Sequence, residues 1–289
     1  MQPKQVRRKP RTPSWMGKML AKLPPWPVFY PLYEASRLNL VEELYWSPRI
    51  PAGFDGFRIV YLSDIHYGPL FPAERLRDLV QRVNKLHADL VILGGDYSDN
   101  SKNAVKFFQS DLEEGFQAKT AVLGVMGNHD RTRPEDSFDK LIAAMRARGV
   151  IPLVNDGVVL ERKGSRMAFV SCDDFYYAKP DLKKTAAAAK TADFTVFLPH
   201  MPDILPETYK MPGPLFYQLV LCGHTHGGQV AVFGHAIKSS SIYGSRYLSG
   251  WYHEHGADIL VSNGVGTSGL PVRLGAKPQF HLITMKKEM

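Results

Sequence analysis

Short runs of β-forming residues alternate with amphipathic segments along most of the chain. Residues 57–63 predict a buried strand, and residues 73–87 predict a helix with its apolar side chains on one stripe. The alternation continues with strands at 89–93 and 120–126 and with helices near 103–116 and 134–148. Alternating strands and helices indicate an α/β core.

The second half of the chain is richer in strands. One helix is expected at residues 180–190, around a run of alanines. Strands are expected at 157–161, 166–171, 194–198, 218–222, 229–233, 258–262 and 280–285. Residues 50–289 contain no internal repeat and no low-complexity linker, so we expect one domain at 54–289, preceded by a leader at 1–50.

Positive charge is concentrated in the leader. The net charge is +8, and residues 1–33 contain seven lysines and arginines and no acid, which leaves +1 for the rest of the chain. A nucleic-acid-binding domain spreads its basic residues over a folded face. No nucleic-acid partner is therefore expected.

The same leader is rich in tryptophan, tyrosine and leucine, interrupted by Pro24, Pro25, Pro27 and Pro31. No apolar run approaches the roughly 20 residues of a membrane-spanning helix, and Lys22 with the prolines breaks what would be a signal-peptide core. Basic and aromatic residues together favour a segment that lies in the headgroup region of an anionic membrane surface. The alternative is a tail whose aromatic side chains pack back on the domain.

The two cysteines, Cys172 and Cys222, each lie in or beside an apolar run. They form no spaced framework, which favours small buried thiols in a reducing compartment over a disulfide. Together with the basic leader, this predicts a cytoplasmic protein that is peripheral on the inner face of the cell membrane.

Polar side chains with metal-binding chemistry follow five of the predicted strands. Ligand sites in α/β sheets form outside the carboxyl ends of the strands, so these side chains are expected to meet at one rim. The strand ends carry Asp64 and His66, Asp96 and Asp99, Asn128 and His129, His200, and finally His224 and His226.

The last of these blocks, Gly223-His224-Thr225-His226-Gly227, places two imidazoles two residues apart. Side chains at that spacing share a face of extended backbone, and the glycines let the chain approach a ligand closely. Taken alone, the block is weak evidence for a metal, and the alternative is a turn that happens to contain two histidines. Whether this block binds a metal depends on whether the other strand ends supply further ligands.

In this order, the blocks resemble the calcineurin-like metallophosphoesterases. The family pattern is Asp-x-His, Gly-Asp-x-x-Asp, Gly-Asn-His-Asp/Glu, His and Gly-His-x-His, and every block is present between residues 64 and 226. The resemblance implies an α/β (α+β) fold over residues 54–289. In that fold, a four-layer α-β-β-α sandwich with two central mixed sheets holds a dimetal site at the C-terminal ends of the strands.

The resemblance also implies which residues hold the two metals. One ion would be held by Asp64, His66, Asp96 and His226, and the other by Asp96, Asn128, His200 and His224. Imidazole and carboxylate suit Mn, Fe, Zn and Ni, and a carboxylate such as that of Asp96 can bridge two ions. We expect two divalent metal ions, Mn first, with Fe, Zn, Ni or Mg as alternatives. Such a pair activates a bridging hydroxide for in-line attack at phosphorus.

His129 has a different role in the family, beside the scissile phosphate, with Asp99 as its orienting partner. An imidazolium there would stabilise charge or protonate the leaving oxygen near neutral pH. The alternative for Asp99 is a helix N-cap ahead of residues 103–116. Asp130 is interpreted as a capping residue, or as an acceptor for a metal-bound imidazole, rather than as a ligand.

Substrate contacts are harder to assign. Arg131 and Arg273 could each pair bidentately with a substrate phosphate, and the alternative for Arg273 is a strand-end charge in solvent. The basic leader, residues 227–229 and residues 260–273 are similar to a bacterial group of membrane-associated phosphodiesterases. One lineage of that group cleaves the pyrophosphate of UDP-2,3-diacylglucosamine in lipid A biosynthesis. The group commonly has an arginine at the position of Asn263, which is the third candidate contact.

Three functions remain open on this reasoning. The first is a hydrolase of a lipid-linked phosphodiester or pyrophosphate, a nucleotide-linked lipid for example, with residues 1–33 on an anionic membrane surface. The second is a soluble phosphodiesterase or phosphatase for nucleotides or small esters, and the third is a non-catalytic scaffold on the same fold. The full ligand set with His129 and Asp99 favours an enzyme, because a scaffold could lose these residues without penalty.

Overall fold

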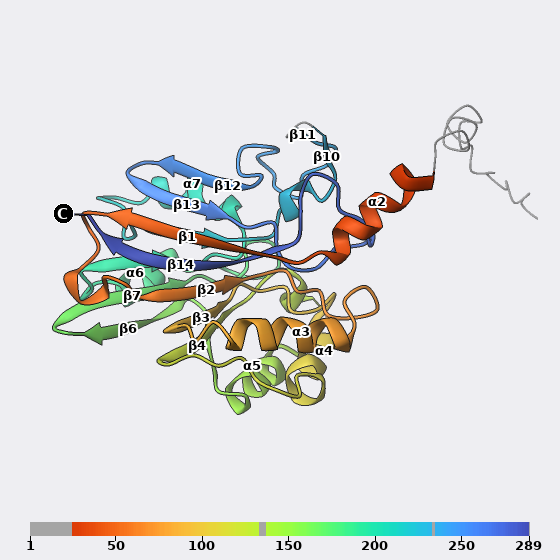
Figure 1. Ribbon diagram of the computed structural model, residues 1–289. Coiled ribbons are helices and arrows are strands. Elements are labelled where there is room, and N and C mark those ends of the chain that lie inside the picture. The colour runs from red at the N-terminus through yellow and green to blue at the C-terminus, as the bar shows by residue number, and fades with distance from the viewer. Residues whose placement is uncertain (1–24, 133–136, 233–234, 289) are drawn as a thin grey trace, which may run out of the picture.

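Two six-stranded sheets stack face to face in the computed structural model, which describes residues 25–132, 137–232 and 235–288 (Figure 1). The first sheet has the order β1 (Asn39–Ser47), β14 (Gln279–Lys287), β2 (Arg58–Leu62), β3 (Leu90–Leu93), β4 (Ala121–Val125) and β5 (Val150–Leu153). The second has the order β12 (Gly250–Glu254), β13 (Ala257–Val261), β9 (Leu219–Cys222), β8 (Phe194–Phe197), β7 (Ser165–Ser171) and β6 (Asp156–Arg162). Both sheets are mixed.

Helices cover the outer faces of both sheets, which completes the predicted four-layer α-β-β-α sandwich. The first sheet is covered by α3 (Ala73–Asn84), α4 (Ser101–Lys106) and α5 (Ser137–Ala147), and the second by α6 (Leu182–Ala188) and α7 (Leu205–Tyr209) (Figure 1). A separate hairpin is formed by β10 (Ala231–Val232) and β11 (His235–Ala236). The expected fold class is confirmed.

The central strands are apolar on both sides because each faces a different core. In β2, Val60 and Leu62 pack against the helices, whereas Ile59 and Tyr61 pack between the two sheets. Every residue of β3, β8 and β9 is buried, so these strands appear in the sequence as continuous apolar runs rather than as alternating patterns. The parallel neighbours β2, β3 and β4 end at the same edge, as do β8 and β9.

The start of the folded core lies earlier than the predicted boundary near residue 54. β1 pairs in parallel with β14 along its whole length, from Asn39 opposite Gln279 to Ser47 opposite Lys287. Residues 39–50 therefore belong to the domain and not to the leader. β1 is an edge strand that buries Tyr45 and leaves Trp46 exposed. Its mixture of polar and apolar residues makes it harder to recognise in the sequence than the apolar central strands.

Another correction concerns the helix expected at 103–116. The α-helical part ends at Lys106 and continues as a π-helical turn, η2 (Phe107–Asp111), in which both phenylalanines are buried. The expected strand at 229–233 is also shorter, because β10 covers only two residues and residue 233 lies outside the described part of the chain.

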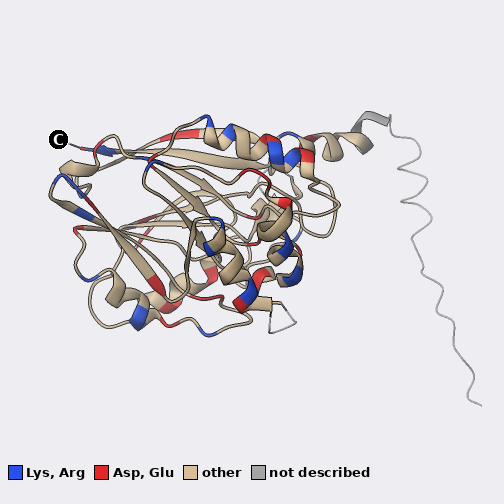
Figure 2. Cartoon of the chain, turned by 90° about the horizontal axis from the view of Figure 1, so that it is seen from below, with Lys and Arg blue, Asp and Glu red and all other residues tan. Residues whose placement is uncertain are grey.

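Ahead of β1, the helix α2 (Pro25–Ser36) extends from the end of the molecule that carries β10 and β11 (Figure 1). Residues 1–24, with all seven basic residues of the leader, lie outside the described residues. Among the residues described, no helix has both the length and the apolar character needed to cross a membrane. On the face seen in Figure 2, lysines and arginines are interspersed with acidic residues over the helices.

Candidate metal centre

Every predicted metal ligand lies just beyond the C-terminal end of a central strand. Asp64 and His66 follow β2, Asp96 follows β3, Asn128 follows β4, His200 follows β8, and His224 and His226 follow β9. Because the two sheets stack with these ends at one edge, side chains from both sheets converge there. The six carboxylate and imidazole residues of the set are buried.

A first cluster contains Asp64, His66 and His226. One ligand atom from each lies within 4.8 Å of the other two. The Nε2 atoms of the two histidines are 3.1 Å apart, and Asp64 Oδ1 lies 3.5 Å from His226 Nε2. Asp96 Oδ2 is 3.7 Å from His66 Nε2, at the side of this cluster.

A second cluster contains Asp96, His200 and His224, again with one ligand atom of each within 4.8 Å of the others. His200 Nε2 lies 3.2 Å from Asp96 Oδ2, and its Nδ1 is 2.7 Å from the carbonyl oxygen of Gly94. Donation from Nδ1 to that carbonyl leaves Nε2 free to bind a cation. Asp96 therefore lies between the clusters, at the position expected of a bridging ligand.

Buried atoms without hydrogen-bond partners show what this centre can hold. Within the described chain, Asn128 Oδ1, His200 Nε2 and His224 Nε2 are buried and have no hydrogen-bond partner. Such atoms normally cost about 1–3 kcal/mol each, so their clustering requires an explanation. Carboxylate, amide and imidazole donors around one shared carboxylate fit two divalent cations. The assignment of individual ligands to each cation remains a prediction.

The ligand loops leave the strands through left-handed backbone conformations. Asp64, Asp96 and His224 have φ angles of 55°, 53° and 69°, a region that non-glycine residues seldom adopt. His226, at φ 53°, begins the 3₁₀ turn η5 (His226–Gly228). The expectation that the two histidines share a face of extended backbone is therefore wrong, because tight turns aim them at the centre instead. Such strain is common at functional sites.

Asp130 holds two of these loops together through backbone hydrogen bonds, rather than capping a helix as predicted. Its Oδ2 accepts hydrogen bonds from the backbone N–H groups of Asp96 and Gly127, at 2.8 and 2.9 Å, and its Oδ1 accepts one from Tyr97. Burial and the nearby charge of Asp96 raise the pKa of Asp130 to about 7. Through these hydrogen bonds, the carboxyl group of Asp130 fixes the backbone of Asp96, the candidate bridging ligand.

Comparison with known proteins identifies this arrangement. Residues 57–228 match the family model for the calcineurin-like phosphoesterases. The chain belongs to this family. It is 31% identical over 256 residues to the uncharacterized metallophosphoesterase YkuE of Bacillus subtilis (strain 168), covering 88% of this chain and 87% of that protein. It is 26% identical over 231 residues to the phosphodiesterase YaeI of Escherichia coli (strain K12), covering 79% and 82%.

Among solved structures, the phosphopantetheinyl hydrolase PptH from Mycobacterium tuberculosis matches with a TM-score of 0.43 and 14% identity, over 73% of this chain and 90% of that one. Family membership, the phosphodiesterase relative and the clustered ligands together establish a metal-dependent phosphoester hydrolase with a dinuclear divalent metal site.

In this phosphoesterase, the predicted partnership of His129 with Asp99 takes a different form. His129 Nδ1 lies 2.8 Å from the backbone carbonyl of Asp99, not from its carboxylate. The carboxylate instead accepts from Nδ1 of His66, at 3.1 Å, and this hydrogen bond is the largest cause of the lowered pKa of Asp99. Asp99 thus orients a metal ligand with its side chain and His129 with its main chain.

Arg273 does not reach the substrate side of the phosphoesterase. It is therefore neither a contact to the substrate phosphate nor a charge in solvent, which were the two predictions for it. Its side chain is completely buried and donates to the backbone carbonyls of His226 and Asn263, both at 2.7 Å. Its Nη2 also lies 3.0 Å from His226 Nδ1. Burial and the adjacent guanidinium hold the pKa of His226 well below its usual value, which keeps the imidazole neutral, as a metal ligand must be.

The other two candidate contacts are also engaged within the protein. Arg131 forms a bidentate ion pair with Asp173, in which its Nε lies 2.8 Å from Oδ1. Asn263 accepts from the hydroxyl of Ser249 at 2.6 Å and donates to the carbonyl of Lys277 at 3.2 Å. Neither side chain lines the cavity beside the metal centre.

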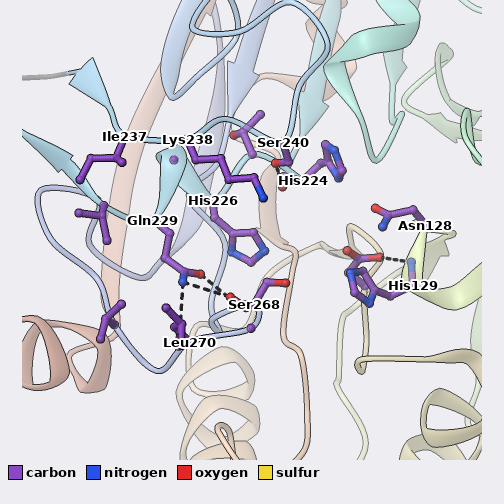
Figure 3. Close-up of a pocket in the computed structure, with 16 residues that line it drawn as sticks. Asn128, His129, His224, His226, Gln229, Ile237, Lys238, Ser240, Ser268 and Leu270 are labelled. Carbon is purple, nitrogen blue, oxygen red and sulfur yellow. Dashed lines mark hydrogen bonds between the residues drawn. The ribbon is translucent and has the colours of Figure 1, made fainter. Parts of the chain in front are cut away.

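That cavity has a volume of about 510 Å³ and contains residues that the sequence did not single out. Asn128, His129 and His224 lie at one end, and Ile237 and Leu270 lie at the other (Figure 3). Between the two ends lie Gln229, Lys238 and Ser268. Of these, Gln229 and Ser268 belong to stretches noted in the sequence, whereas Lys238 does not, because a lone lysine in a loop carries no recognisable signal.

Proposed function

We propose that this protein hydrolyses a phosphodiester or pyrophosphate bond of a lipid-linked substrate, such as UDP-2,3-diacylglucosamine, at an anionic membrane surface. The observation that carries the proposal is the apolar end of the cavity. Ile237 and Leu270 are 76% and 64% exposed, respectively, and yet line the same cavity as the candidate metal ligands. Exposed large apolar side chains beside a polar site are typical of a surface that binds an apolar group.

The apolar end of the cavity is connected to α2. The backbone N–H of Arg273 donates to the carbonyl of Pro31 at 2.9 Å, and that of Gly275 donates to the carboxylate of Glu34 at 3.1 Å. Phe29 is 59% exposed on the same helix. The helix therefore presents apolar side chains next to the loop that carries Leu270.

The seven basic residues of the leader, between Lys4 and Lys22, precede this helix in the sequence. Basic residues attract anionic headgroups, and aromatic and apolar side chains enter the interface, so the two features together favour a membrane surface as the partner. In this proposal the protein is cytoplasmic and peripheral on the inner face of the cell membrane. A lipid-linked phosphoester could then enter the cavity without leaving the interface.

The chain's own residues account for the remaining chemistry. Two divalent cations, manganese in our proposal, supply Lewis acidity and an activated water for in-line attack at phosphorus. Asp64, Asp96 and the other candidate ligands would hold the pair, and Ser63 donates to Asp64 Oδ2 at 2.5 Å, which fixes that carboxylate. His129 lies at the metal end of the cavity, where it can stabilise charge or donate a proton to the leaving oxygen.

Hydrolysis of bis-p-nitrophenyl phosphate with Mn²⁺ tests the dimetal site. Asp96→Asn should abolish turnover, because Asp96 belongs to the second cluster and its Oδ2 also lies 3.7 Å from His66 Nε2 of the first. Asp139→Asn, at an exposed position on α5, is the matched control and should leave the rate unchanged. Equal turnover by wild type and Asp96→Asn would contradict the assigned centre.

Lipid specificity and membrane binding need separate measurements. The purified enzyme should cleave UDP-2,3-diacylglucosamine in preference to cyclic nucleotides and other water-soluble esters, as followed by mass spectrometry of the phosphorus products. Cleavage confined to the soluble compounds would favour a soluble phosphodiesterase. Deleting residues 1–24, or replacing Phe29 and Leu32 with serine, should reduce co-sedimentation with phosphatidylglycerol vesicles, and undiminished binding would contradict the membrane proposal.

A further inference from the structure

The substrate cavity contains one cationic side chain that has no role in holding the fold. Arg131 and Arg273 are both engaged within the protein. Among the described residues that line the cavity, Lys238 is the sole lysine or arginine. It is exposed, and its ammonium group has no hydrogen-bond or ion-pair partner in the described part of the chain.

The backbone around Lys238 is fixed against the loop that carries His224 and His226. On one side, Ile237 N–H donates to the carbonyl of Val230 at 3.0 Å. On the other, the hydroxyl of Ser240 donates to the carbonyl of His224 at 3.0 Å. These two hydrogen bonds hold the segment that carries Lys238 next to the metal centre.

Gly228 allows this close packing. A Cβ at Gly228 would lie 2.2 Å from the Cβ of Ala236 and 3.2 Å from the carbonyl oxygen of Lys238. Its φ of 74° also lies in the left-handed region that favours glycine. The Gly-Gly pair after the last histidine thus brings the lysine-bearing segment against the ligand loop.

The direction of the lysine side chain indicates what it binds. Figure 3 shows Lys238 extending into the cavity with its ammonium end on the side of His226. Along the cavity, the order is metal ligands, then Lys238, then the apolar end formed by Ile237 and Leu270. A cation at this place would pair with a negative group located between the reacting phosphorus and an apolar part of the substrate.

We infer that Lys238 is a specificity-determining residue that binds a second anionic group of the substrate, adjacent to the phosphoryl group held at the metal centre. The inference rests on the proposed phosphoester hydrolysis and narrows its substrate class. The preferred substrate carries two neighbouring negative groups, followed by an apolar group. Esters with a single negative charge and neutral substituents would gain nothing from this lysine.

Calorimetric titration of the full-length, Mn²⁺-loaded protein tests this inference without requiring turnover. Methylphosphonate offers one anionic group, methylenebisphosphonate offers a second phosphonate, and phosphonoacetate offers a carboxylate instead. Lys238→Ala should weaken binding of methylenebisphosphonate by about tenfold, a free-energy change of about 1.4 kcal/mol. Binding of methylphosphonate should not change. Lys238→Arg should retain most of the affinity for the bisphosphonate.

Lys183→Ala, at an exposed position on α6, is the matched control and should bind all three probes like wild type. A parallel loss for phosphonoacetate would show that any second anion is recognised, whereas an isolated loss for the bisphosphonate would assign the lysine to a second phosphate. Unchanged bisphosphonate binding by Lys238→Ala would overturn the inference, and so would an equal loss for methylphosphonate. Failure to hydrolyse bis-p-nitrophenyl phosphate would contradict the proposed function but leave these binding comparisons interpretable.

Discussion

Replacing Gly127 with alanine tests how closely the protein must hold the carboxylate of Asp96. A Cβ at this position would lie 2.1 Å from Asp96 Oδ1 and 2.6 Å from the Asp96 backbone nitrogen. Non-bonded heavy atoms prefer separations of about 3.5 Å, so the carboxylate would have to move by about 1 Å or more. The backbone of Gly127 lies outside the left-handed region, so alanine adds a side chain without adding backbone strain.

A displacement of about 1 Å at a reacting centre can reduce the rate by about 100-fold. Because Asp96 belongs to the second cluster and lies beside the first, we expect Gly127→Ala to lower the metal content at both sites and to reduce kcat/KM by about that factor. The extra methyl group should also lower the free energy of unfolding by about 1–3 kcal/mol. The measurements are Mn²⁺-dependent hydrolysis of bis-p-nitrophenyl phosphate, metal content by mass spectrometry and thermal unfolding.

Gly115→Ala is the matched control, because a Cβ there would meet no atom within 4 Å and Gly115 also lies outside the left-handed region. It should match wild type in rate, metal content and melting temperature. If Gly127→Ala behaved in the same way, the position of the Asp96 carboxylate would not limit metal binding or catalysis, and the reasoning would be refuted.

Three further predictions concern the two metal clusters, the candidate general acid His129 and the hydrogen bonds of Glu43. His224→Ala and His226→Ala should each lose one metal preferentially, since the two imidazoles belong to different clusters, and loss of both metals from either variant would argue against separate sites. His129→Ala should reduce kcat by about 10²–10⁴-fold with little change in metal content, whereas loss of metal would make it a ligand. Glu43→Gln should lower the melting temperature by about 2–6 °C at pH 7, because Glu43 accepts hydrogen bonds from His281, at 2.9 Å, and from Trp251. Burial raises the pKa of Glu43, but these hydrogen bonds outweigh burial and lower it. The stabilisation is therefore complete above pH of about 4.3 and lost as the pH falls through the lower folded value. A difference that persisted at pH 2 would contradict this assignment.

The metal centre could be predicted because each ligand follows a strongly apolar strand. β2, β3, β4, β8 and β9 are almost entirely buried, and the alignment of their ends follows from their parallel pairing. Local sequence therefore contained both the ligand types and the reason for their convergence. The strand β1 was missed because an edge strand with one exposed face carries a weaker pattern.

The substrate contacts could not be predicted in the same way, because they depend on packing between distant segments. Arg273 donates its hydrogen bonds to backbone carbonyls of two separate loops, and the spacing of residues in the sequence does not predict these contacts. Arg131 is paired with Asp173, 42 positions away in the sequence. Lys238 becomes important only because Gly228 brings its segment against the ligand loop. The backbone turns at Asp64 and His224 were likewise hidden, since non-glycine residues rarely adopt them.

The position of the last strand has a consequence for how the chain is made. β14 lies between β1 and β2, so two strands from the beginning of the domain both pair with residues near its end. During synthesis, the first sheet stays open until those final residues leave the ribosome. Contacts over such sequence separations form slowly, because a long loop must close before they stabilise the fold. A premature stop codon ahead of Gln279 would therefore leave both β1 and β2 without the strand that pairs with them, a species prone to aggregation and to proteolysis.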